Sequence, residues 1–319
     1  MFDRIVTLSL NPSIDVTLWV DRLRMGEENS VAEEACEAAG KAVNVARALH
    51  NYGMRPVNII LAGRHNRQRF ETGLRREGLD CRLVEVEGYT RENLSIVQQD
   101  GSITRLMREG FAVPYEALVA VEEMLAKEVS PGTLVILSGS LPGGITPRLL
   151  RRICDGIAAA GGRVALDTSS VTEEDLAAIR PWAIKPNRAE LCGYAGRPLE
   201  TLDEMVAYGR HLVELGVEHC LVSLDKEGVL YLGEEKVIQV QVPEVDVVSQ
   251  IPGAGGVRRR RHGHCGLPVH GGRTPEEAGH RQHPYAPPVP GAGGLTRKKE
   301  IPLFSWKTGG FLIVLCRKI

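Results

Sequence analysis

The feature that most constrains the fold of this chain is a repeated alternation between short apolar segments and longer amphipathic ones. It begins with "RIVTLSL" at residues 4–10, which is typical of a strand. In "GKAVNVARALHNYG" at 40–53, apolar residues recur at helical spacing and a glycine ends the run. The apolar run "VNIILAG" at 57–63 follows, so the beginning of the chain predicts a β-α-β unit.

The same alternation returns in the second half of the chain. Four short apolar segments predict strands, and two amphipathic stretches between them predict helices. The predicted strands lie at 132–140, 161–167, 182–187 and 219–225, and the helices at 147–162 and 202–216. Connections that carry a helix join parallel strands, and parallel sheets are buried on both faces. The sequence therefore predicts an α/β fold, with helices on both faces of a mostly parallel sheet.

Two segments, at about 13–36 and 83–108, break this pattern because they alternate in the manner of antiparallel strands. The second segment contains "ENLSIVQQ" and "ITRLMRE" on either side of Asp100-Gly101, a pair typical of a hairpin turn. We interpret both segments as a small β lid over the carboxyl edge of the main sheet.

Composition excludes several classes of protein. A chain of 319 residues with 43% hydrophobic content can bury a full core. Its seven cysteines are odd in number and never spaced as C-x-x-C, so we expect neither a disulfide framework nor a zinc site. The amino terminus lacks the pattern of a secretory signal. The apolar run at 311–316 is far shorter than the ~20 residues that span a bilayer. We expect a cytoplasmic protein without a membrane partner.

Glycine-rich and polar motifs follow most of the predicted strands. Ligands of open α/β sheets bind outside the carboxyl ends of the strands, so these motifs mark the expected site. Glycine lets the backbone approach a ligand, and consecutive N–H groups at a helix start hold anions. The motifs are "LNPSID" at 10–15, "AAGKAVN" at 38–44, "SGSLPGG" at 138–144, "KPNRAE" at 185–190, "SLDKEG" at 223–228 and "GAGG" at 253–256.

From Met1 to about Ser249 the chain resembles the PfkB family of sugar kinases. Five stretches occur in the family's order and spacing, namely "TLSLNPSID", "AAGKAVNVARAL", "SGSLPGGI", "KPNRAELCGYAGR" and "VDVVS". The resemblance implies a ribokinase-like three-layer sandwich with a β lid, which would form one kinase domain over residues 1–251. It also implies ATP and Mg²⁺ as reagents, transfer of the γ-phosphoryl group to a phosphosugar hydroxyl, and a homodimer formed through the lid.

The substrate implied by the resemblance is fructose 1-phosphate, which such kinases convert to fructose 1,6-bisphosphate. Details such as "RENLSIVQQDGSI" favour this sugar. Kinases of the family that act on tagatose 6-phosphate or fructose 6-phosphate share much of the pattern, so both sugars stay open as alternatives. An inactive member that binds phosphosugar or nucleotide without turnover is a further alternative.

The resemblance also assigns roles to residues at matching positions. The phosphosugar would be bound by an acid for its hydroxyls, by a loop at a helix start, and by an arginine and a serine that face its phosphate. In that order these residues are Asp15; Gly40, Lys41 and Asn44; and Arg91 and Ser140. The ATP phosphates would lie at Lys185, Asn187 and Glu190, and the adenosine beside Ser223 and Gly228. Magnesium keeps several waters, so the carboxylate of Glu190 could hold it through water.

Two positions depart from the family's pattern within these motifs. Ala42 stands where the family usually has glycine, and Asp225 does the same in the later motif. A methyl group at position 42 is tolerated if φ is negative there. A carboxylate at 225 would be unfavourable near phosphates if it pointed inward.

The chain departs more strongly after Ile251. In the family a short link leads to Gly-Ala-Gly-Asp and a helix, where the Asp is the catalytic base and the glycine turn forms an anion hole. Here Gly253, Ala254 and Gly255 match the turn, but Gly256 stands in place of the Asp. The chain as written therefore lacks the family's base at this position.

Residues 252–319 also differ from the rest in charge and composition. The formal net charge is -10 over residues 1–251 and +9 over 252–319. Residues 253–294 hold 11 Gly and 6 Pro but no Ile, Phe or Met, so no helix with an apolar face fits there. Read from their second nucleotide, codons for "VRRRRHGHCG" can encode Ser-Val-Val-Ala-Gly-Met-Ala-Ile-Ala, a helix of the family's kind. We hypothesise a reading-frame disturbance near Pro252 that leaves an aberrant remnant of the domain, which the coding DNA tests directly.

The four arginines at 258–261 offer a competing interpretation as a contact for nucleic acid. Such a run binds phosphates non-specifically, but no aromatic platform or recognition helix accompanies it, so we expect no nucleic-acid partner. A Walker A loop would need Gly at position 35 and Ser or Thr at position 42, where this chain has Ala35 and Ala42. A hydrolase nucleophile elbow would need Gly at both Ser138 and Pro142. Neither motif is present.

Overall fold

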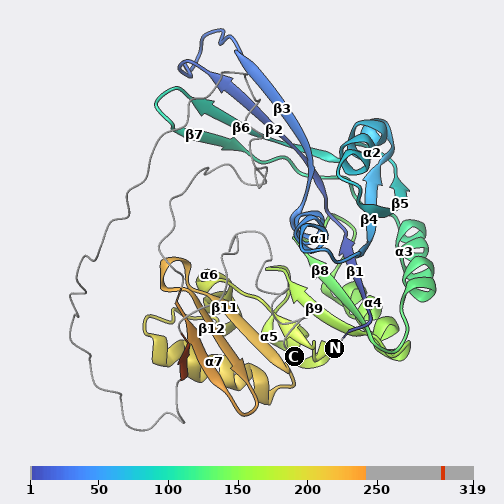
Figure 1. Ribbon diagram of the computed structural model, residues 1–319, viewed down its shortest axis with the longest axis vertical. Helices are drawn as coiled ribbons and strands as arrows, with labels where there is room; N and C mark the ends of the chain where they lie inside the picture. Colours follow the sequence, from blue (N-terminus) through green and yellow to red (C-terminus); the bar gives the residue numbers. More distant parts are fainter. Residues whose placement is uncertain (1, 242–295, 299–319) are drawn as a thin grey trace, which may run out of the picture.

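The computed structural model describes residues 2–241 and 296–298 (Figure 1). Ten of the described strands form one sheet in the order β14-β13-β12-β11-β10-β9-β8-β1-β4-β5. Neighbours are parallel from β5 to β11, whereas β12 is antiparallel to both β11 and β13. The mostly parallel sheet confirms the predicted α/β class. The strands are β1 Arg4–Ser9, β4 Val57–Gly63, β5 Asp80–Val86, β8 Thr133–Ser138, β9 Arg163–Asp167, β10 Ala183–Ile184, β11 His219–Ser223, β12 Val229–Gly233, β13 Val237–Val240 and β14 Thr296–Lys298.

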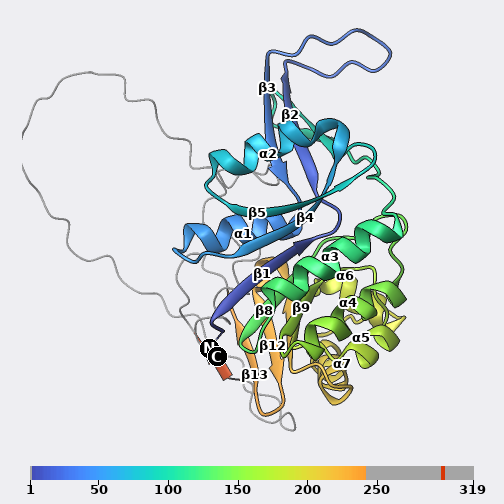
Figure 2. The ribbon, with the colours of Figure 1, turned by 90° about the vertical axis from the view of Figure 1, so that its right-hand side faces the viewer.

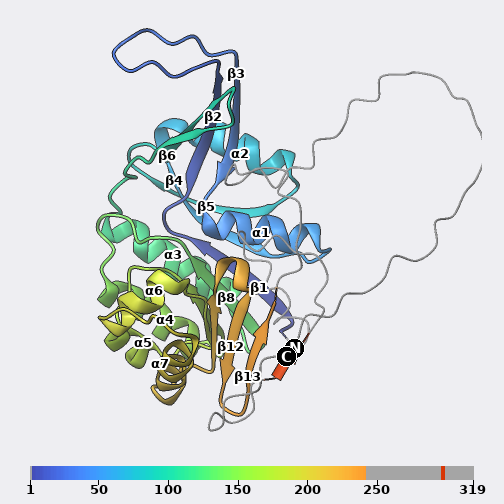
Figure 3. The same ribbon diagram turned by 90° about the vertical axis from the view of Figure 1, so that its left-hand side faces the viewer.

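Helices lie on both faces of this sheet, as the alternation predicts. In the described part of the chain, one face carries α1 and α2, and the opposite face carries α3 to α7 (Figures 2 and 3). The first pair is α1 Lys41–Asn51 and α2 Arg67–Arg76. The second set is α3 Tyr115–Glu128, α4 Pro147–Ala159, α5 Glu173–Ile179, α6 Arg188–Ala195 and α7 Leu202–Glu214. Two short 3₁₀ turns, Arg64–Asn66 and Asp225–Glu227, complete the described elements.

A second sheet of four strands, in the order β3-β2-β6-β7, stands at one end of the molecule (Figure 1). Its strands are β2 Ser13–Val20, β3 Glu33–Ala39, β6 Arg91–Gln98 and β7 Ile103–Leu106. β6 and β7 pair antiparallel around the predicted hairpin turn, whereas β2 and β6 pair in parallel. The second lid segment was predicted at about 83–108. Residues 83–86 instead belong to β5 of the main sheet, so this part of the lid begins at Arg91. The lid follows β1 after only residues 10–12, so it is rooted at the carboxyl edge of the main sheet.

The alternation of side chains along β1 explains why both faces of the sheet are covered. Val6 and Leu8 are fully buried with the core under α3 to α7, while Ile5 belongs to a separate cluster with Leu49 of α1. Ala42 is also fully buried and lies inside α1, so the methyl group fits the helical backbone and does not disturb it. In the described part of the chain, no helix is long and apolar enough to cross a membrane.

A row of aromatic side chains lies at the amino ends of the strands, opposite the lid. The ring of Trp182 meets Phe2 edge to face at 4.8 Å and His219 at 4.9 Å between ring centroids. Nδ1 of His219 lies 3.0 Å from the hydroxyl oxygen of Tyr231. Burial lowers the pKa of His219, and the charges of the neighbouring residues act on it in opposite directions.

This lowered pKa predicts a pH-dependent stability. His219 titrates below its ordinary value of 6.5 in the folded state, so the unfolded state binds the proton more readily. As the pH falls below 6.5, protonation of His219 in the unfolded state therefore lowers the free energy of unfolding. We expect His219→Gln, which does not titrate, to remove this part of the dependence. Urea unfolding of both proteins at about pH 7.5 and about pH 5.5 measures it, and an equal loss of stability on acidification in both proteins would contradict the prediction.

Candidate active site

Polar residues from the sequence motifs, together with Asp167, lie along the carboxyl edge of the main sheet, from which the lid also rises. Each comes directly after a strand or ends one, because parallel strands bring their carboxyl ends to the same edge. Asn11 follows β1, Ser140 follows β8, Asp167 ends β9, Lys185 follows β10 and Ser223 ends β11. Of these residues, Asp167 contacts Lys41 at the start of α1.

Gly40 precedes α1 with a φ of 121°, a conformation that residues with a side chain rarely adopt. A Cβ atom at this position would lie 3.0 Å from the Cα atom of Pro12. The backbone here therefore closely approaches the connection between β1 and β2. The amide of Asn44 donates to the carbonyl of Gly40, which leaves the preceding N–H groups without helical partners. The loop and helix start therefore present free N–H groups of the kind that can bind an anion.

Asp15 lies on lid strand β2. This strand is the neighbour of β3, which leads into the loop at Gly40. Oδ1 of Asp15 accepts a hydrogen bond from the hydroxyl of Ser13 at 2.9 Å and one from the amide of Asn93 at 3.1 Å. Both bonds use the same oxygen, and no described residue donates to Oδ2. The second carboxylate oxygen is thus a free acceptor within the described part of the site. Asn93, on β6, was not predicted from the sequence.

Arg91 begins β6 and reaches back to the end of β1. Its guanidinium donates at 3.3 Å to the carbonyls of Pro12 and Asn11, and the amide of Asn11 in turn donates to Ser140 Oγ at 3.1 Å. Burial lowers the pKa of Arg91, and the charge of Asp15 opposes that change. Arg91 forms no ion pair with a described carboxylate, and the hydrogen bonds of its guanidinium within the described residues go to neutral carbonyls. Such a guanidinium suits an anionic ligand.

Asp167 contacts one residue from each of the two predicted groups, Lys41 and Lys185, although the sequence analysis did not single it out. The residue is only 8% exposed, and its carboxylate accepts from Ser138 Oγ at 2.9 Å. The carboxylate also forms ion pairs with Lys41 at 3.4 Å and with Lys185 at 3.7 Å. Burial alone would lower the pKa of Lys41, but the carboxylates of Asp167 and Glu190 outweigh it, and the pKa is raised. Lys41 is therefore held as a cation.

Asn187 and Glu190 form a capping box at the start of α6. The Asn187 side-chain oxygen accepts from the backbone N–H of Glu190 at 2.8 Å, and the Glu190 carboxylate accepts from the backbone N–H of Asn187 at 2.9 Å. Glu190 also pairs with Lys41 at 3.6 Å. Glu190 and Asp167 thus contact the same ammonium group. Asn187 and Glu190, two of the three residues expected at the ATP phosphates, are therefore fixed by their own helix start.

Ser223 lies beside these residues, since its amide donates to the carbonyl of Pro186 at 2.9 Å. Gly228, after the following turn, has a φ of 97°, and a Cβ there would lie 1.9 Å from the carbonyl oxygen of Val240. This close approach requires glycine. Asp225 adopts a φ of 49° and is exposed, so its carboxylate does not point inward. The departure at 225 thus places a mildly strained residue at the surface of the turn.

The residues predicted to bind the sugar and those predicted to bind ATP form two groups. Lys41 belongs to the first, and its ion pairs with Glu190 and Asp167 connect it to the second. The predicted anion-hole loop, Gly253 to Gly256, lies outside the described residues. Among the described residues, no cluster of three or more His, Cys, Asp or Glu side chains is arranged to hold a metal ion.

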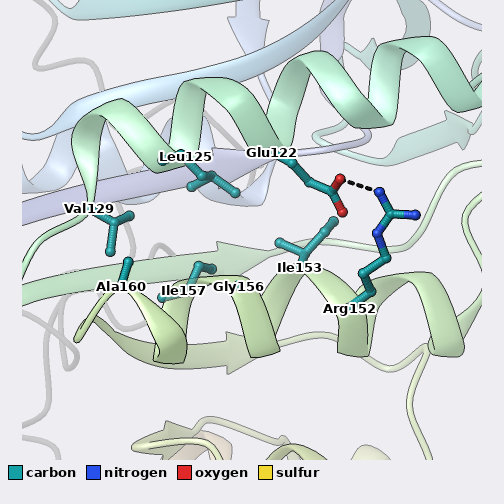
Figure 4. A pocket seen from close by; sticks show the side chains of 9 residues that line it. Glu122, Leu125, Val129, Arg152, Ile153, Gly156, Ile157 and Ala160 are labelled. Atoms are coloured by element: carbon teal, nitrogen blue, oxygen red, sulfur yellow. Dashed lines mark hydrogen bonds and ion pairs between the residues drawn. The ribbon is translucent and has the colours of Figure 1, made fainter.

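A groove of about 350 Å³ lies elsewhere, between α3 and α4 (Figure 4). Aliphatic side chains such as Leu125 and Ile157 line it, and the ion pair between Glu122 and Arg152 lies at one end. None of its lining residues belongs to the cluster at the strand ends. The groove is therefore separate from the candidate active site.

Comparison with solved structures defines the class of this fold. Phosphofructokinase-2 from Escherichia coli in complex with fructose-6-phosphate is 28% identical, with a TM-score of 0.72 over 78% of this chain and 82% of that chain. The tetrameric inhibited form of the same enzyme matches with 28% identity and a TM-score of 0.71, over 77% of this chain and 81% of that one. The sheet, the helices on both faces and the lid thus form a ribokinase-like fold.

Sequence comparison identifies the family. The family model described as "pfkB family carbohydrate kinase" matches residues 5–255. The 1-phosphofructokinase of Vibrio cholerae is 31% identical over 257 residues, which are 80% of each chain, and that of Escherichia coli (strain K12) is 32% identical over 263 residues, 80% of this chain and 81% of the relative. The chain therefore belongs to the PfkB family of carbohydrate kinases, phosphotransferases that act on a hydroxyl group. Its relatives support a sugar kinase of the phosphofructokinase type.

The ion pairs of Asp167 predict a change at Lys41. In Asp167→Asn the amide cannot balance the ammonium charge, so burial and the remaining Glu190 compete alone, and we expect the pKa of Lys41 to fall. Competitive amine labelling across alkaline pH, read by mass spectrometry, measures this pKa, with the exposed Lys127 as an internal reference. An unchanged labelling profile at Lys41 would show that Asp167 does not set its charge.

Proposed function

We propose that this chain binds ATP, Mg²⁺ and a phosphosugar, and that the sugar is fructose 1-phosphate, which the reaction converts to fructose 1,6-bisphosphate. The observation that carries the proposal is the half-buried guanidinium of Arg91, which has no described carboxylate partner and lies beside Asn11, whose amide reaches Ser140. A phosphate already present on the sugar would supply the missing negative charge. The relatives named 1-phosphofructokinase support fructose 1-phosphate as the sugar.

Fructose 6-phosphate is the second candidate. It is favoured by the similarity to phosphofructokinase-2, whose solved structure is a complex with that sugar. The two sugars carry their phosphates at opposite ends. A direct comparison of their binding therefore separates the two proposals.

The sugar hydroxyls would lie between Asp15 and Asn44. Asp15 offers the free oxygen Oδ2 as an acceptor, so a hydroxyl can donate to it while it is oriented toward the nucleotide. Lys41 lies at the start of the same helix as Asn44, and its cationic form suits the negative charge that spreads over the transferred phosphoryl group. The N–H groups at the start of α1 would act on the same charge.

The nucleotide would lie on the other side of Lys41. PfkB kinases use ATP with a metal ion, generally Mg²⁺. Glu190 and Asp167 fit such an ion, because both offer carboxylate oxygens, and Mg²⁺ prefers oxygen ligands and keeps waters. Once bound, the ion neutralises charge on the ATP phosphates. Lys185 would contact those phosphates, and Ser223 and Gly228 would form the turn beside the adenosine.

The proposal extends to the catalytic loop, where Gly256 replaces the expected base. Glycine accepts no proton through a side chain, so the sugar hydroxyl would have to lose its proton without a positioned base at this place. We therefore propose that the chain as written binds its ligands but turns them over slowly, in line with the hypothesis of a disturbed reading frame after residue 251.

We also propose that the lid joins two copies of the chain. Four large apolar residues of the lid region are exposed, namely Met25, Val31, Leu106 and Met107, with exposures of 88%, 47%, 51% and 66%. Leu106 ends β7, Met107 follows it, and Met25 and Val31 lie in the connection between β2 and β3. Exposed large apolar groups of this kind are typical of an interface. Sedimentation equilibrium distinguishes the resulting dimer from a monomer.

Binding measurements test the proposed substrate. Calorimetric titration with fructose 1-phosphate, fructose 6-phosphate and tagatose 6-phosphate should show the tightest binding for the first. Arg91→Ala should weaken that binding by ~1.5–3 kcal/mol, the usual value for a charge-assisted hydrogen bond, and should leave the binding of unphosphorylated fructose unchanged. Equal binding of fructose 1-phosphate by the variant would remove Arg91 from the site.

Turnover measurements test the missing base. The absence of a positioned base predicts a rate about 10²–10⁴-fold below ordinary kinase rates of about 1–100 per second. Gly256→Asp should recover little if the following helix is also lost, because the new carboxylate is not held in line with the hydroxyl. A chain with the reading frame restored after residue 251 should recover turnover. Ordinary rates for the unaltered chain would show that another group acts as base.

A further inference from the structure

Arg47 lies on α1 one turn after Asn44, and its guanidinium is used almost completely inside the protein. Its side chain is only 17% exposed. Nε and Nη2 form a forked pair with the carboxylate of Glu77, which follows α2, and Nη2 also donates to the carbonyl of Ala38 at 2.6 Å. The remaining nitrogen, Nη1, donates to Oδ1 of Asn44 at 2.5 Å. Arg47 thus ties α1 to α2, to the end of lid strand β3 and to a residue of the substrate loop.

The contact with Asn44 fixes which end of its amide faces the site. A guanidinium carries five donors and no acceptor, so only the oxygen of the amide can face it. If the amide turned over, two N–H groups would oppose each other in a half-buried place. The forked pair with Glu77 prevents Arg47 from moving to accommodate such a turn. Arg47 therefore holds the NH₂ group of Asn44 away from itself.

We infer that Arg47 is a positioning residue that presents Asn44 Nδ2 to the substrate as a hydrogen-bond donor. The inference rests on the proposed function, in which Asn44 contacts the phosphosugar. It adds a rule for recognition, because Asp15 can only accept while Asn44 can only donate. The ligand oxygen at Asn44 must therefore act as an acceptor, and a hydroxyl that meets both residues must donate to Asp15 and accept from Asn44.

A double-mutant cycle tests this inference, with fructose 1-phosphate as the titrant and calorimetry as the readout. Arg47→Met keeps the length of the side chain but lets the Asn44 amide rotate, so we expect about tenfold weaker binding, the effect of about one hydrogen bond. In an Asn44→Ala background the same change should have almost no effect, because Arg47 acts through Asn44. An equal loss in both backgrounds would overturn the inference, since Arg47 would then act through the lid or touch the sugar itself.

Asn44→Asp supplies a second test that does not disturb Arg47. Its carboxylate still accepts from Arg47, so the variant should unfold at no lower temperature than the unaltered chain. It has no Nδ2 donor, so its binding of fructose 1-phosphate should fall as far as in Asn44→Ala. Binding equal to that of the unaltered chain would show that Nδ2 is not the contact, and would overturn the inference even if Arg47→Met failed to fold.

Two further measurements separate this inference from the proposed function. Arg75→Met removes an exposed arginine of α2 whose ion pair among the described residues is with Glu71 one turn away, and it should bind the sugar as the unaltered chain does. If the unaltered chain bound none of the three phosphosugars, the proposed function would fail and this inference with it. If it bound one of them and Arg47→Met bound it equally well, the inference alone would fail.

Discussion

The buried carboxylate of Asp167 is the group on which the arrangement of the strand ends depends. It accepts from Ser138 at the end of β8 and pairs with Lys41 at the start of α1 and Lys185 after β10. A buried charge without such partners is strongly destabilising, so the three contacts are coupled to the fold itself. One side chain thereby fixes the separation between the two lysines. The proposed sugar and nucleotide sides are held apart at a set distance before either ligand arrives.

Much of the fold could be predicted, because alternating apolar periods carry a physical meaning. Strands such as β4 and β8 are buried on both faces and read as continuous apolar runs, and α1 has a buried stripe at helical spacing. The antiparallel pair β12–β13 was not predicted. Its turn is made of Glu234 and Glu235, and this pair lacks the glycine or asparagine that usually marks a hairpin.

The candidate site was predictable only where a motif carried it. Of the residues assigned by resemblance, the described ones lie at or near the strand ends and in the lid, whereas Asp167, Asn93 and Arg47 were missed. Asp167 reads as a single acid that ends the run "RVALD", and its partner Lys41 comes from the opposite half of the domain. Arg47 reads as a solvated helix residue until Glu77 and Ala38 are brought beside it. Pairings between residues distant in sequence leave no local pattern, so the structure was needed to find them.

The parallel pairing of β2 with β6 has a consequence for the order of folding. Ser13 lies opposite Arg91 in this pair, and the whole stretch from β3 to β5 separates the two strands in sequence. Closing so long a loop costs chain entropy before any contact repays it, so nonlocal pairs of this kind form late. The bond between Asp15 and Asn93 crosses this pair. The main sheet contains a pair that is separated by still more chain, since Arg4 of β1 lies opposite Thr133 of β8. Nascent chains would thus complete the lid and the main sheet, and with them the proposed sugar site, only after β8 has been synthesised.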